Sequence, residues 1–287
     1  MSAIIPGRQI ARAMCDRVAG EAEVFLEKHG LPPALAVVLV GEHPASDIYV
    51  RHKTAECRRA GIRSIEHRLS ATTTQAALLN LVHSLNRDGT VHGVLIQLPL
   101  PRHIDAGRVL DAIHPGKDVD GFHPVNVGRL STGTAELVPC TPLGCMMLLD
   151  TVFDELRGKH AVVVGKSNIV GKPVALLLLE RECTVTVTHI ATQGLAHIVS
   201  GADIVVAAAG APRLVRGDWI KPGAVVIDVG ITRVEEPDGK VSIVGDCAAE
   251  EMGHAAAVTP VPGGVGPMTI ACLLANTLKA ARAFADE

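Results

Sequence analysis

The stretch AVVVGKSNIVGKP, residues 161–173, decides the fold of the second half of the chain. Its apolar start predicts a buried strand, Gly165 begins a turn, and Pro173 suits the first turn of a helix, where no backbone N–H is needed. A strand, a glycine turn and a helix together form a phosphate-binding geometry, because the helix N-terminus offers N–H groups and a positive dipole. A simple strand-to-helix turn remains the alternative, since the spacing is neither GxGxxG nor GxxxxGK[ST].

The same alternation of strand and helix extends outward from this stretch in both directions. Strands are predicted at 34–40, 62–69, 91–96, 184–188, 203–207 and 224–229, and helices at 7–29, 45–60, 73–86, 174–182 and 268–285. Thr72–Thr74 supplies an N-terminal cap and Gly61 a C-terminal one. This order predicts an α/β fold with parallel, doubly wound sheets. The irregular stretch Lys117–Pro139 is the predicted boundary between two domains with a cleft between them, and ligands are expected at the carboxyl ends of the strands.

The composition excludes several classes of protein. The 287 residues are 48% hydrophobic but only 2% aromatic, and the net charge is −3 without any dense basic run, so we expect no binding to nucleic acid. No apolar run reaches the roughly 18 residues of a membrane helix, and no signal peptide is recognisable, so we expect no membrane partner and a cytoplasmic location. The seven cysteines are scattered, which predicts buried free thiols and no metal site.

Three polar constellations are candidates for chemistry. Tyr49 and Lys53 share one helix face, where a ring could stack on a planar substrate beside an acid–base amine, although a solvated face is the favoured alternative. Gln97 ends an apolar run, and it either tunes a catalytic lysine or is a satisfied structural amide. Asp118 and Asp120 could accept N–H groups from a heterocycle, although an Asx-type turn is favoured on the pattern alone.

Two loops complete the pattern. The segment 259–269 carries three prolines and three glycines just before a helix, and such a loop can lay its backbone against a flat ligand. The strand 184–188 is followed by His189-Ile190, without the acidic residue that usually binds the ribose of NAD. This absence weakly disfavours simple NAD use.

Taken together, these residues resemble the methylenetetrahydrofolate dehydrogenase/cyclohydrolase family along essentially the whole chain. The segments that carry the resemblance are VGEHPAS at 40–46 with Tyr49 and Lys53, QLPLP at 97–101, KDVDG at 117–121, PCTP at 139–142, VGKSNIVGKP at 164–173, IDVGI at 227–231 and the loop 259–269. All of them occur in the order found in the family.

The resemblance implies a folate-binding catalytic domain at 1–138, completed by the helix 268–287, and a Rossmann NAD(P)-binding domain at 139–267. It also implies a homodimer paired through the Rossmann domain. In such enzymes Lys53 would be the acid–base centre, Gln97 would tune it, Tyr49 would stack on the aminobenzoyl ring and Asp120 would hold the pterin. Further folate contacts would come from Leu98, Pro262, Gly263 and Gly264, and cofactor contacts from Thr141, Gly165, Lys166, Ser167, Ile169, Val170, Ile190 and Ile231.

The implied reaction has two steps on tetrahydrofolate derivatives. Methylenetetrahydrofolate gives a hydride to the nicotinamide, and water then attacks the cationic methenyl carbon while Lys53 manages protons. If one site holds the folate for both steps, the intermediate stays close to the groups that act on it next. An uncharged Lys53 would avoid repelling the methenyl cation.

Two positions depart from the pattern of the family. Lys166 stands where arginine is usual, and Ile190 stands where serine is usual; in NADP-using members both positions contact the 2′-phosphate. Lysine lacks the bidentate fork of arginine, and isoleucine cannot donate a hydrogen bond. We therefore expect NADP as the cofactor, with a weakened preference and some use of NAD.

Three competing interpretations predict a different set of residues. A different two-domain dehydrogenase would have no need for Tyr49, Gln97 and Asp120 together. A binding protein without catalysis would have lost Lys53. A dehydrogenase without cyclohydrolase activity would not retain Lys53, Gln97 and Asp120 as a set.

Overall fold

The computed structural model describes residues 2–41, 44–235 and 239–285. In the helix that begins at Pro44, side chains are described from Val50 onward. The chain folds as two compact units. The three-stranded unit comprises Arg12–Cys140 and Ile270–Glu287, and the six-stranded unit comprises Met1–Ala11 and Thr141–Thr269. Helices α1 (Gly7–His29) and α9 (Val265–Ala285) each begin in the six-stranded unit and continue in the three-stranded one. Strands and helices alternate through both units, which confirms the predicted α/β class.

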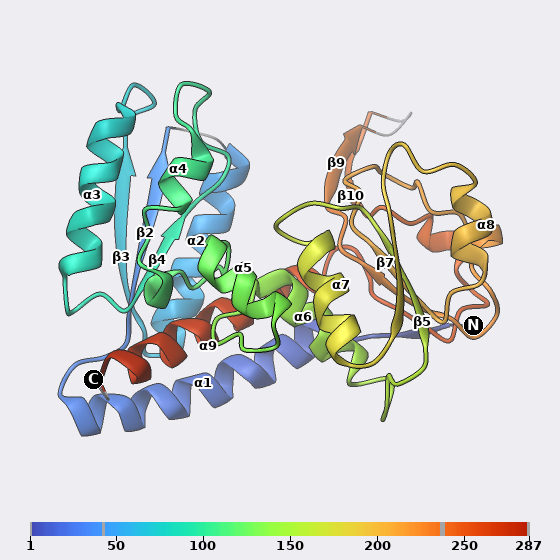
Figure 1. Ribbon diagram of the computed structural model, residues 1–287, viewed down its shortest axis with the longest axis horizontal. Coiled ribbons are helices and arrows are strands. Elements are labelled where there is room, and N and C mark those ends of the chain that lie inside the picture. The colour runs from blue at the N-terminus through green and yellow to red at the C-terminus, as the bar shows by residue number, and fades with distance from the viewer. Residues whose placement is uncertain (1, 42–43, 236–238, 286–287) are drawn as a thin grey trace. The chain divides into compact units, whose positions relative to one another are not determined.

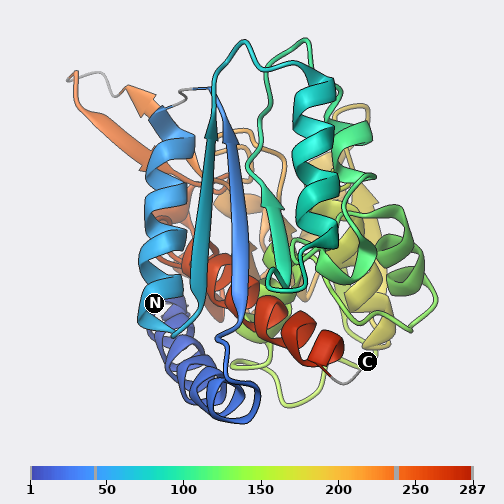
Figure 2. The same ribbon diagram turned by 90° about the vertical axis from the view of Figure 1, so that its left-hand side faces the viewer.

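The three-stranded unit is built on a parallel sheet in the order β3 (Arg63–Leu69), β2 (Ala34–Val40), β4 (Gly93–Ile96). All seven residues of β2 are buried, as its uninterrupted apolar run predicts for a central parallel strand. Helices α2 (Pro44–Arg59) and α3 (Gln75–Arg87) lie on opposite sides of the sheet (Figures 1 and 2). One face of β2 packs with Leu78, Val82 and Leu85 of α3.

The predicted ends of α2 and α3 are confirmed. Gly61 follows α2 with a φ of +67°, a left-handed conformation that glycine adopts without strain. Thr74 caps α3, because its side chain accepts a hydrogen bond from the Ala77 N–H at 3.2 Å.

The stretch Lys117–Pro139 was expected to be irregular, and this expectation is wrong in part. It contains α5 (Pro124–Ser131), which follows the short helices α4 (Ala106–Leu110) and η1 (Pro115–Lys117). His123 caps α5 by accepting the Val125 N–H at 3.1 Å, and Pro124 occupies the first turn. A histidine cap followed by proline is a weaker helix signal than Ser, Thr, Asp or Asn, so the pattern was missed.

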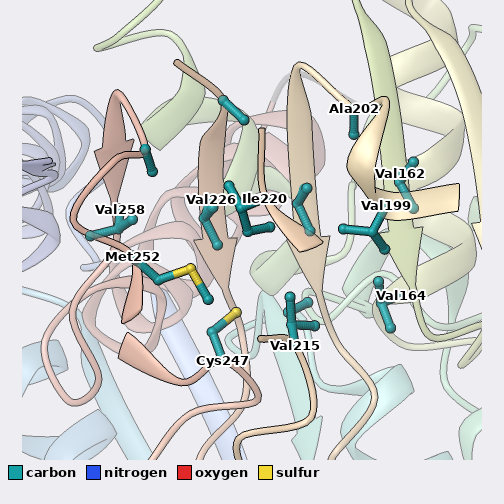
Figure 3. Close-up of a cluster of buried hydrophobic side chains, with 14 residues drawn as sticks. Val162, Val164, Val199, Ala202, Val215, Ile220, Val226, Cys247, Met252 and Val258 are labelled. Atoms are coloured by element: carbon teal, nitrogen blue, oxygen red, sulfur yellow. The ribbon is translucent and has the colours of Figure 1, made fainter. Parts of the chain in front are cut away.

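The six-stranded unit holds a sheet in the order β1 (Ala3–Ile4), β11 (Ala257–Val258), β8 (Val225–Asp228), β7 (Ile204–Ala207), β5 (His160–Val164), β6 (Thr184–Thr188), with every pair parallel. α7 (Gly171–Glu180) follows β5, and α8 (Leu195–Ser200) follows β6. Figure 3 shows one face of this sheet, where Val162, Val164 and Val226 belong to one buried cluster with Val199 and Met252. The core of this unit therefore consists mainly of small aliphatic side chains, as the composition predicts.

Several elements were not anticipated. The predicted boundaries place residues 1–11 in the N-terminal domain, whereas the structure groups them with the six-stranded unit, because β1 pairs with β11 at its edge. An antiparallel hairpin of β9 (Thr232–Glu235) and β10 (Val241–Val244) follows β8. The helix α6 (Cys140–Leu149) and the turns η2 (Gly217–Trp219) and η3 (Ala249–Glu251) complete the unit. Within the described residues, no helix is long and apolar enough to cross a membrane.

Candidate active site

Helix α2 presents Lys53 to the interior of the three-stranded unit. The Lys53 side chain is buried, with 8% of its surface exposed, whereas its neighbours Arg51 and His52 are exposed. Lys53 Nζ donates a hydrogen bond to Gln97 Oε1 at 3.2 Å. The favoured sequence interpretation, a solvated helix face, is therefore wrong for Lys53.

Gln97 is fixed at the carboxyl end of β4. Its backbone N–H donates to the Val38 carbonyl at 2.9 Å, which extends the ladder of the sheet by one step. Its side-chain Nε2 donates to the Leu98 carbonyl at 2.8 Å. With Nε2 engaged as a donor, Oε1 must face the lysine as an acceptor, so the amide holds the amine in one orientation.

Asp120 shares this environment. Desolvation by the surrounding protein raises the pKa of Asp120 above its ordinary value, the positive charge of Lys53 lowers it, and the charge of Asp118 raises it. The thiol of Cys140 also interacts with Asp120, and it donates to the Val119 carbonyl at 3.2 Å. An amine, an amide and a carboxylate thus come together in one unit.

The two carboxylates of KDVDG have different roles. Asp118 is 1% exposed and accepts hydrogen bonds from the His123 N–H at 2.8 Å and from Asn126 Nδ2 at 2.9 Å. Lys117 is also buried, and its ammonium donates to two carbonyls at the end of α3. Asp118 and Lys117 therefore anchor the segment. Asp118 has a structural role, but its side chain accepts from the N–H five residues on and not from the one two residues on that an Asx turn would use. Asp120 is left as the candidate for chemistry.

Tyr49 lies in α2, but its side chain is outside the described residues. Leu98 follows Gln97 and is partly buried. The loop with Pro262, Gly263 and Gly264 belongs to the six-stranded unit, and a side chain on Gly264 would come within 2.7 Å of the Pro260 carbonyl oxygen. The structure thus brings Lys53, Gln97 and Asp120 together within one unit and builds the glycine loop in the other.

The nucleotide candidate lies between β5 and α7. Gly165 has a φ of +124°, and a Cβ there would lie 2.1 Å from the Ala208 carbonyl oxygen. A Cβ on Gly171 would lie 2.1 Å from the carbonyl oxygen of Gly165 itself. Only glycine fits at these two positions, so the turn folds tightly against the neighbouring strand end.

The N–H groups at the start of α7 were expected to be free, and this is wrong. Ser167 Oγ accepts from the Val170 N–H at 3.1 Å and from the Gly171 N–H at 3.3 Å, and the Ser167 carbonyl accepts from the Lys172 N–H. The fit to a dinucleotide therefore rests on the glycine turn and the helix dipole. Lys166 and Ile169 are exposed in the same loop.

The remaining cofactor candidates lie in the same unit. Ile190, just beyond β6, is fully exposed, and Ile231, after β8, is 52% exposed. The strand before Ile190 ends at Thr188, which is buried and donates to the Val163 carbonyl at 3.3 Å. Thr141 Oγ1 shares a hydrogen bond with Thr269 Oγ1 at 2.9 Å.

Two buried carboxylates were missed by the sequence analysis. Asp228 ends β8 and is 4% exposed, and Asp246 is fully buried. The sequence signal for Asp228 was a single polar residue at the end of an apolar strand. The same signal made Gln97 a candidate site residue. Cys140, beside Asp120, was counted only among the scattered thiols.

Asp228 is expected to make stability fall as pH rises. Desolvation raises the pKa of Asp228 from 3.8 to about 6, against the lowering effect of its N–H donors. Below pH 3.8, the ordinary pKa of an aspartate, the Asp228 carboxyl is protonated in both the folded and the unfolded chain. Above about pH 6 the carboxyl is charged in both, and burying that charge opposes folding. The shift corresponds to a loss on the order of 3 kcal/mol between pH 4 and pH 8.

Urea unfolding of wild type and Asp228→Asn at a series of pH values measures this loss. The free energy of unfolding of the wild type, relative to that of the variant, should decrease as pH rises. Asp203→Asn is the matched control. The hydrogen bond from Lys221 lowers the pKa of Asp203, so ionised Asp203 stabilises the fold and its contribution rises with pH instead of falling. A pH-independent difference for Asp228→Asn would contradict the expectation.

Comparison with known proteins agrees with this geometry. The sequence model described as the tetrahydrofolate dehydrogenase/cyclohydrolase catalytic domain matches residues 5–120, and the one described as the NAD(P)-binding domain matches residues 139–285. The chain is 68% identical to bifunctional protein FolD 1 of Rhizorhabdus wittichii over 98% of this chain and 96% of that protein.

Two solved structures extend the comparison. The bifunctional enzyme FolD of Campylobacter jejuni has a TM-score of 0.94 and 45% identity and covers 99% of both chains. The FolD of Trypanosoma brucei, complexed with NADP cofactor and inhibitor, has a TM-score of 0.95 and 42% identity and covers 100% of this chain and 99% of that one. This chain belongs to the tetrahydrofolate dehydrogenase/cyclohydrolase family.

Proposed function

We propose that the chain oxidises 5,10-methylenetetrahydrofolate to 5,10-methenyltetrahydrofolate with NAD(P)+ and hydrolyses the product to 10-formyltetrahydrofolate. The observation that carries this proposal is the buried Lys53 amine, held by Gln97 Oε1 at 3.2 Å in the environment of the Asp120 carboxylate. Burying an amine is unfavourable unless the site uses or pairs it. An oriented amine that can accept a proton is what the cyclohydrolase step requires.

In the hydrolytic step, the oxygen of a water molecule bonds to the cationic methenyl carbon, and Lys53 accepts a proton from that water. The bond from the carbon to N5 then breaks as the hydroxyl on the carbon loses its remaining proton and becomes the formyl carbonyl. One of the two protons from the water ends on N5 and the other is released to solvent, and the formyl group stays on N10. Gln97 contributes by fixing the direction of the amine.

Folate recognition is assigned to residues of the unit that holds this amine and to one loop of the six-stranded unit. Asp120 would accept N–H hydrogen bonds from the pterin, since a carboxylate is acceptor-only when ionised. Tyr49, Leu98 and the loop Pro262–Gly264 would contact the flat parts of the substrate. The placement of Tyr49 on α2, one helical turn before Lys53, supports its assignment to the same face.

NAD(P)+ supplies the hydride acceptor of the first step when it is bound. The chain's part is to hold the dinucleotide, and the residues assigned to this are Gly165, Lys166, Ser167, Ile169 and Val170 in the turn. Thr141, Ile190 and Ile231 would complete the contacts. A Cβ on Gly165 would lie 2.1 Å from the Ala208 carbonyl oxygen, so the turn packs closely at the carboxyl end of the strands. Ligands bind at this end of open α/β sheets, which supports the assignment.

A spectral assay of the purified chain tests the function. With methylenetetrahydrofolate and either NADP+ or NAD+, we expect reduced cofactor to form with little accumulation of the absorbing methenyl species. If folded protein reduces neither cofactor, the dehydrogenase assignment fails. If methenyl accumulates in the wild type, the cyclohydrolase assignment fails.

The cofactor preference is expected to respond to two exposed positions. NADP is the proposed cofactor, with some use of NAD, because Lys166 and Ile190 offer fewer hydrogen bonds to a 2′-phosphate than arginine and serine would. The double variant Lys166→Arg, Ile190→Ser should raise kcat/KM for NADP+ relative to NAD+ by about tenfold or more, since hydrogen bonds to a charged group contribute roughly 1.5–3 kcal/mol. Steady-state kinetics with both cofactors measures the ratio.

Ile4→Ser is the control for that variant, because Ile4 is an exposed isoleucine on β1 of the same unit and has no assigned role. It should leave the ratio unchanged. A double variant with the wild-type ratio would show that these two positions do not read the 2′-phosphate.

The remaining assignments concern assembly and place in the cell. We propose a homodimer through the six-stranded unit, supported by the open edge strand β6 and by exposed apolar residues Val187, Val241 and Ile243. We also propose a cytoplasmic location, where the seven buried free thiols would remain reduced, and a role in supplying one-carbon units for purine biosynthesis.

A further inference from the structure

Two buried carboxylates tie together three loops of the six-stranded unit. Asp228 Oδ1 accepts from the Gly230 and Asp246 N–H groups at 2.9 Å each, and Asp228 Oδ2 accepts from the Cys247 N–H at 2.9 Å. Asp246 Oδ2 accepts from the Ala209 N–H at 2.6 Å and from the Gly210 N–H at 2.9 Å. Five backbone N–H groups from the segments after β7, β8 and β10 therefore converge on two side chains.

These loops adjoin the dinucleotide turn. The segment after β7 begins with Ala208, whose carbonyl oxygen would lie 2.1 Å from a Cβ on Gly165. Its next two N–H groups donate to Asp246, so the position of the Ala208 carbonyl depends on that carboxylate. The segment after β8 leads through Gly230 to Ile231, which is assigned to the cofactor. Both segments lie at the carboxyl ends of parallel strands, where ligands bind in open α/β sheets.

We propose that Asp228 and Asp246 are positioning residues for hydride transfer, holding the loops at 208–210 and 229–231 in the arrangement that orients the nicotinamide cofactor. This inference rests on the proposed function. The hydrogen bonds of both carboxylates come from backbone N–H groups of these segments. Their contribution is through the backbone of the two loops, and small displacements of bound reactants cost up to about a hundredfold in rate.

The hydrogen bonds predict a difference between the two positions. Asp228 uses both oxygens as acceptors, so an asparagine would turn an N–H donor toward another N–H. Asp246 uses only Oδ2, and among the described residues its buried Oδ1 has no hydrogen-bond partner. An asparagine at 246 can keep its oxygen toward Ala209 and Gly210 and place Nδ2 at the position of Oδ1. Asparagine should therefore be tolerated at 246 and not at 228.

The test measures both activities in the same protein. We expect Asp246→Ala and Asp228→Asn to lower dehydrogenase kcat/KM by about tenfold or more, while hydrolysis of supplied methenyltetrahydrofolate stays within about twofold. Asp246→Asn should recover dehydrogenase activity to within about threefold of the wild type. Asp203→Asn is the matched control, because Asp203 accepts the His160 N–H at the opposite end of the strands, and it should leave both activities unchanged.

A second measurement serves if Asp246→Ala does not fold. Hydrogen exchange of the Ala209 and Gly210 amides should be slow in the wild type and in Asp246→Asn, and the Gly230 and Cys247 amides should exchange faster in Asp228→Asn. Equal loss of both activities in the folded variants would overturn the inference, as would Asp246→Asn behaving like Asp246→Ala. A wild type that reduces neither cofactor would instead overturn the proposed function itself.

Discussion

Replacing Lys53 by methionine is expected to lower cyclohydrolase activity by on the order of a thousandfold while leaving NAD(P)+ reduction measurable. The buried amine is the group assigned to accept the proton from the attacking water, and such general bases contribute roughly 10²- to 10⁴-fold. Methionine keeps the length and apolar stem of lysine but cannot take a proton. In the coupled spectral assay, the variant should therefore accumulate the absorbing methenyl intermediate as reduced cofactor forms.

His52→Met is the matched control for this experiment. His52 precedes Lys53 in α2 and is exposed, so the same side chain is introduced on the same helix without touching the buried amine. The control should hydrolyse the methenyl species at the wild-type rate. A Lys53→Met protein that shows no methenyl accumulation while still reducing cofactor would remove Lys53 from the acid–base role.

The elements with a strong period or an unbroken apolar run were predictable from the sequence. The helix at 7–29 and the strands at 34–40 and 184–188 have the same limits in the structure as in the prediction. Their signals are local. Burial of one helix face or of a central parallel strand fixes the residue pattern at 7–29 and 34–40, and β-branched residues favour the edge strand 184–188.

Elements stabilised by distant partners were not predictable in this way. β1 is only two residues long and exists because β11, more than 250 positions later, supplies its hydrogen bonds. α6 is apolar on all sides and contains proline and glycine, so it has no amphipathic period to detect. Both depend on tertiary packing that no local pattern encodes.

The site shows the same division. The spacing predicts that Tyr49 and Lys53 share one helix face. It does not show whether that face is exposed to solvent, because the burial of Lys53 depends on the distant strand that ends at Gln97. Spacing alone does not separate Asp118 from Asp120, and only the family resemblance favoured Asp120. Only the fold shows that Asn126 and the His123 backbone engage Asp118 and that Asp120 shares the environment of Lys53.

Substituting alanine for Gly165 is expected to abolish most dehydrogenase activity, because the new Cβ would lie 2.1 Å from the Ala208 carbonyl oxygen. A φ of +124° is also a conformation that residues with a side chain rarely adopt. The turn must therefore move away from the end of β7, and it takes the bound dinucleotide with it. We expect a loss of about a hundredfold or more in dehydrogenase kcat/KM and a destabilisation of about 3 kcal/mol or more.

Gly194→Ala separates the effect of the steric clash from the effect of the backbone strain. Gly194 lies in the same unit with a φ of +65°, but a Cβ there would meet no atom within 4 Å. Its substitution carries only the backbone strain, about 1 kcal/mol, and should leave the dehydrogenase close to wild type. Hydrolysis of supplied methenyltetrahydrofolate should persist in Gly165→Ala, because Lys53, Gln97 and Asp120 belong to the other unit. Dehydrogenase activity equal to that of Gly194→Ala would mean that the turn does not hold the cofactor, whereas loss of both activities together would mean that the two units do not fold independently of this turn.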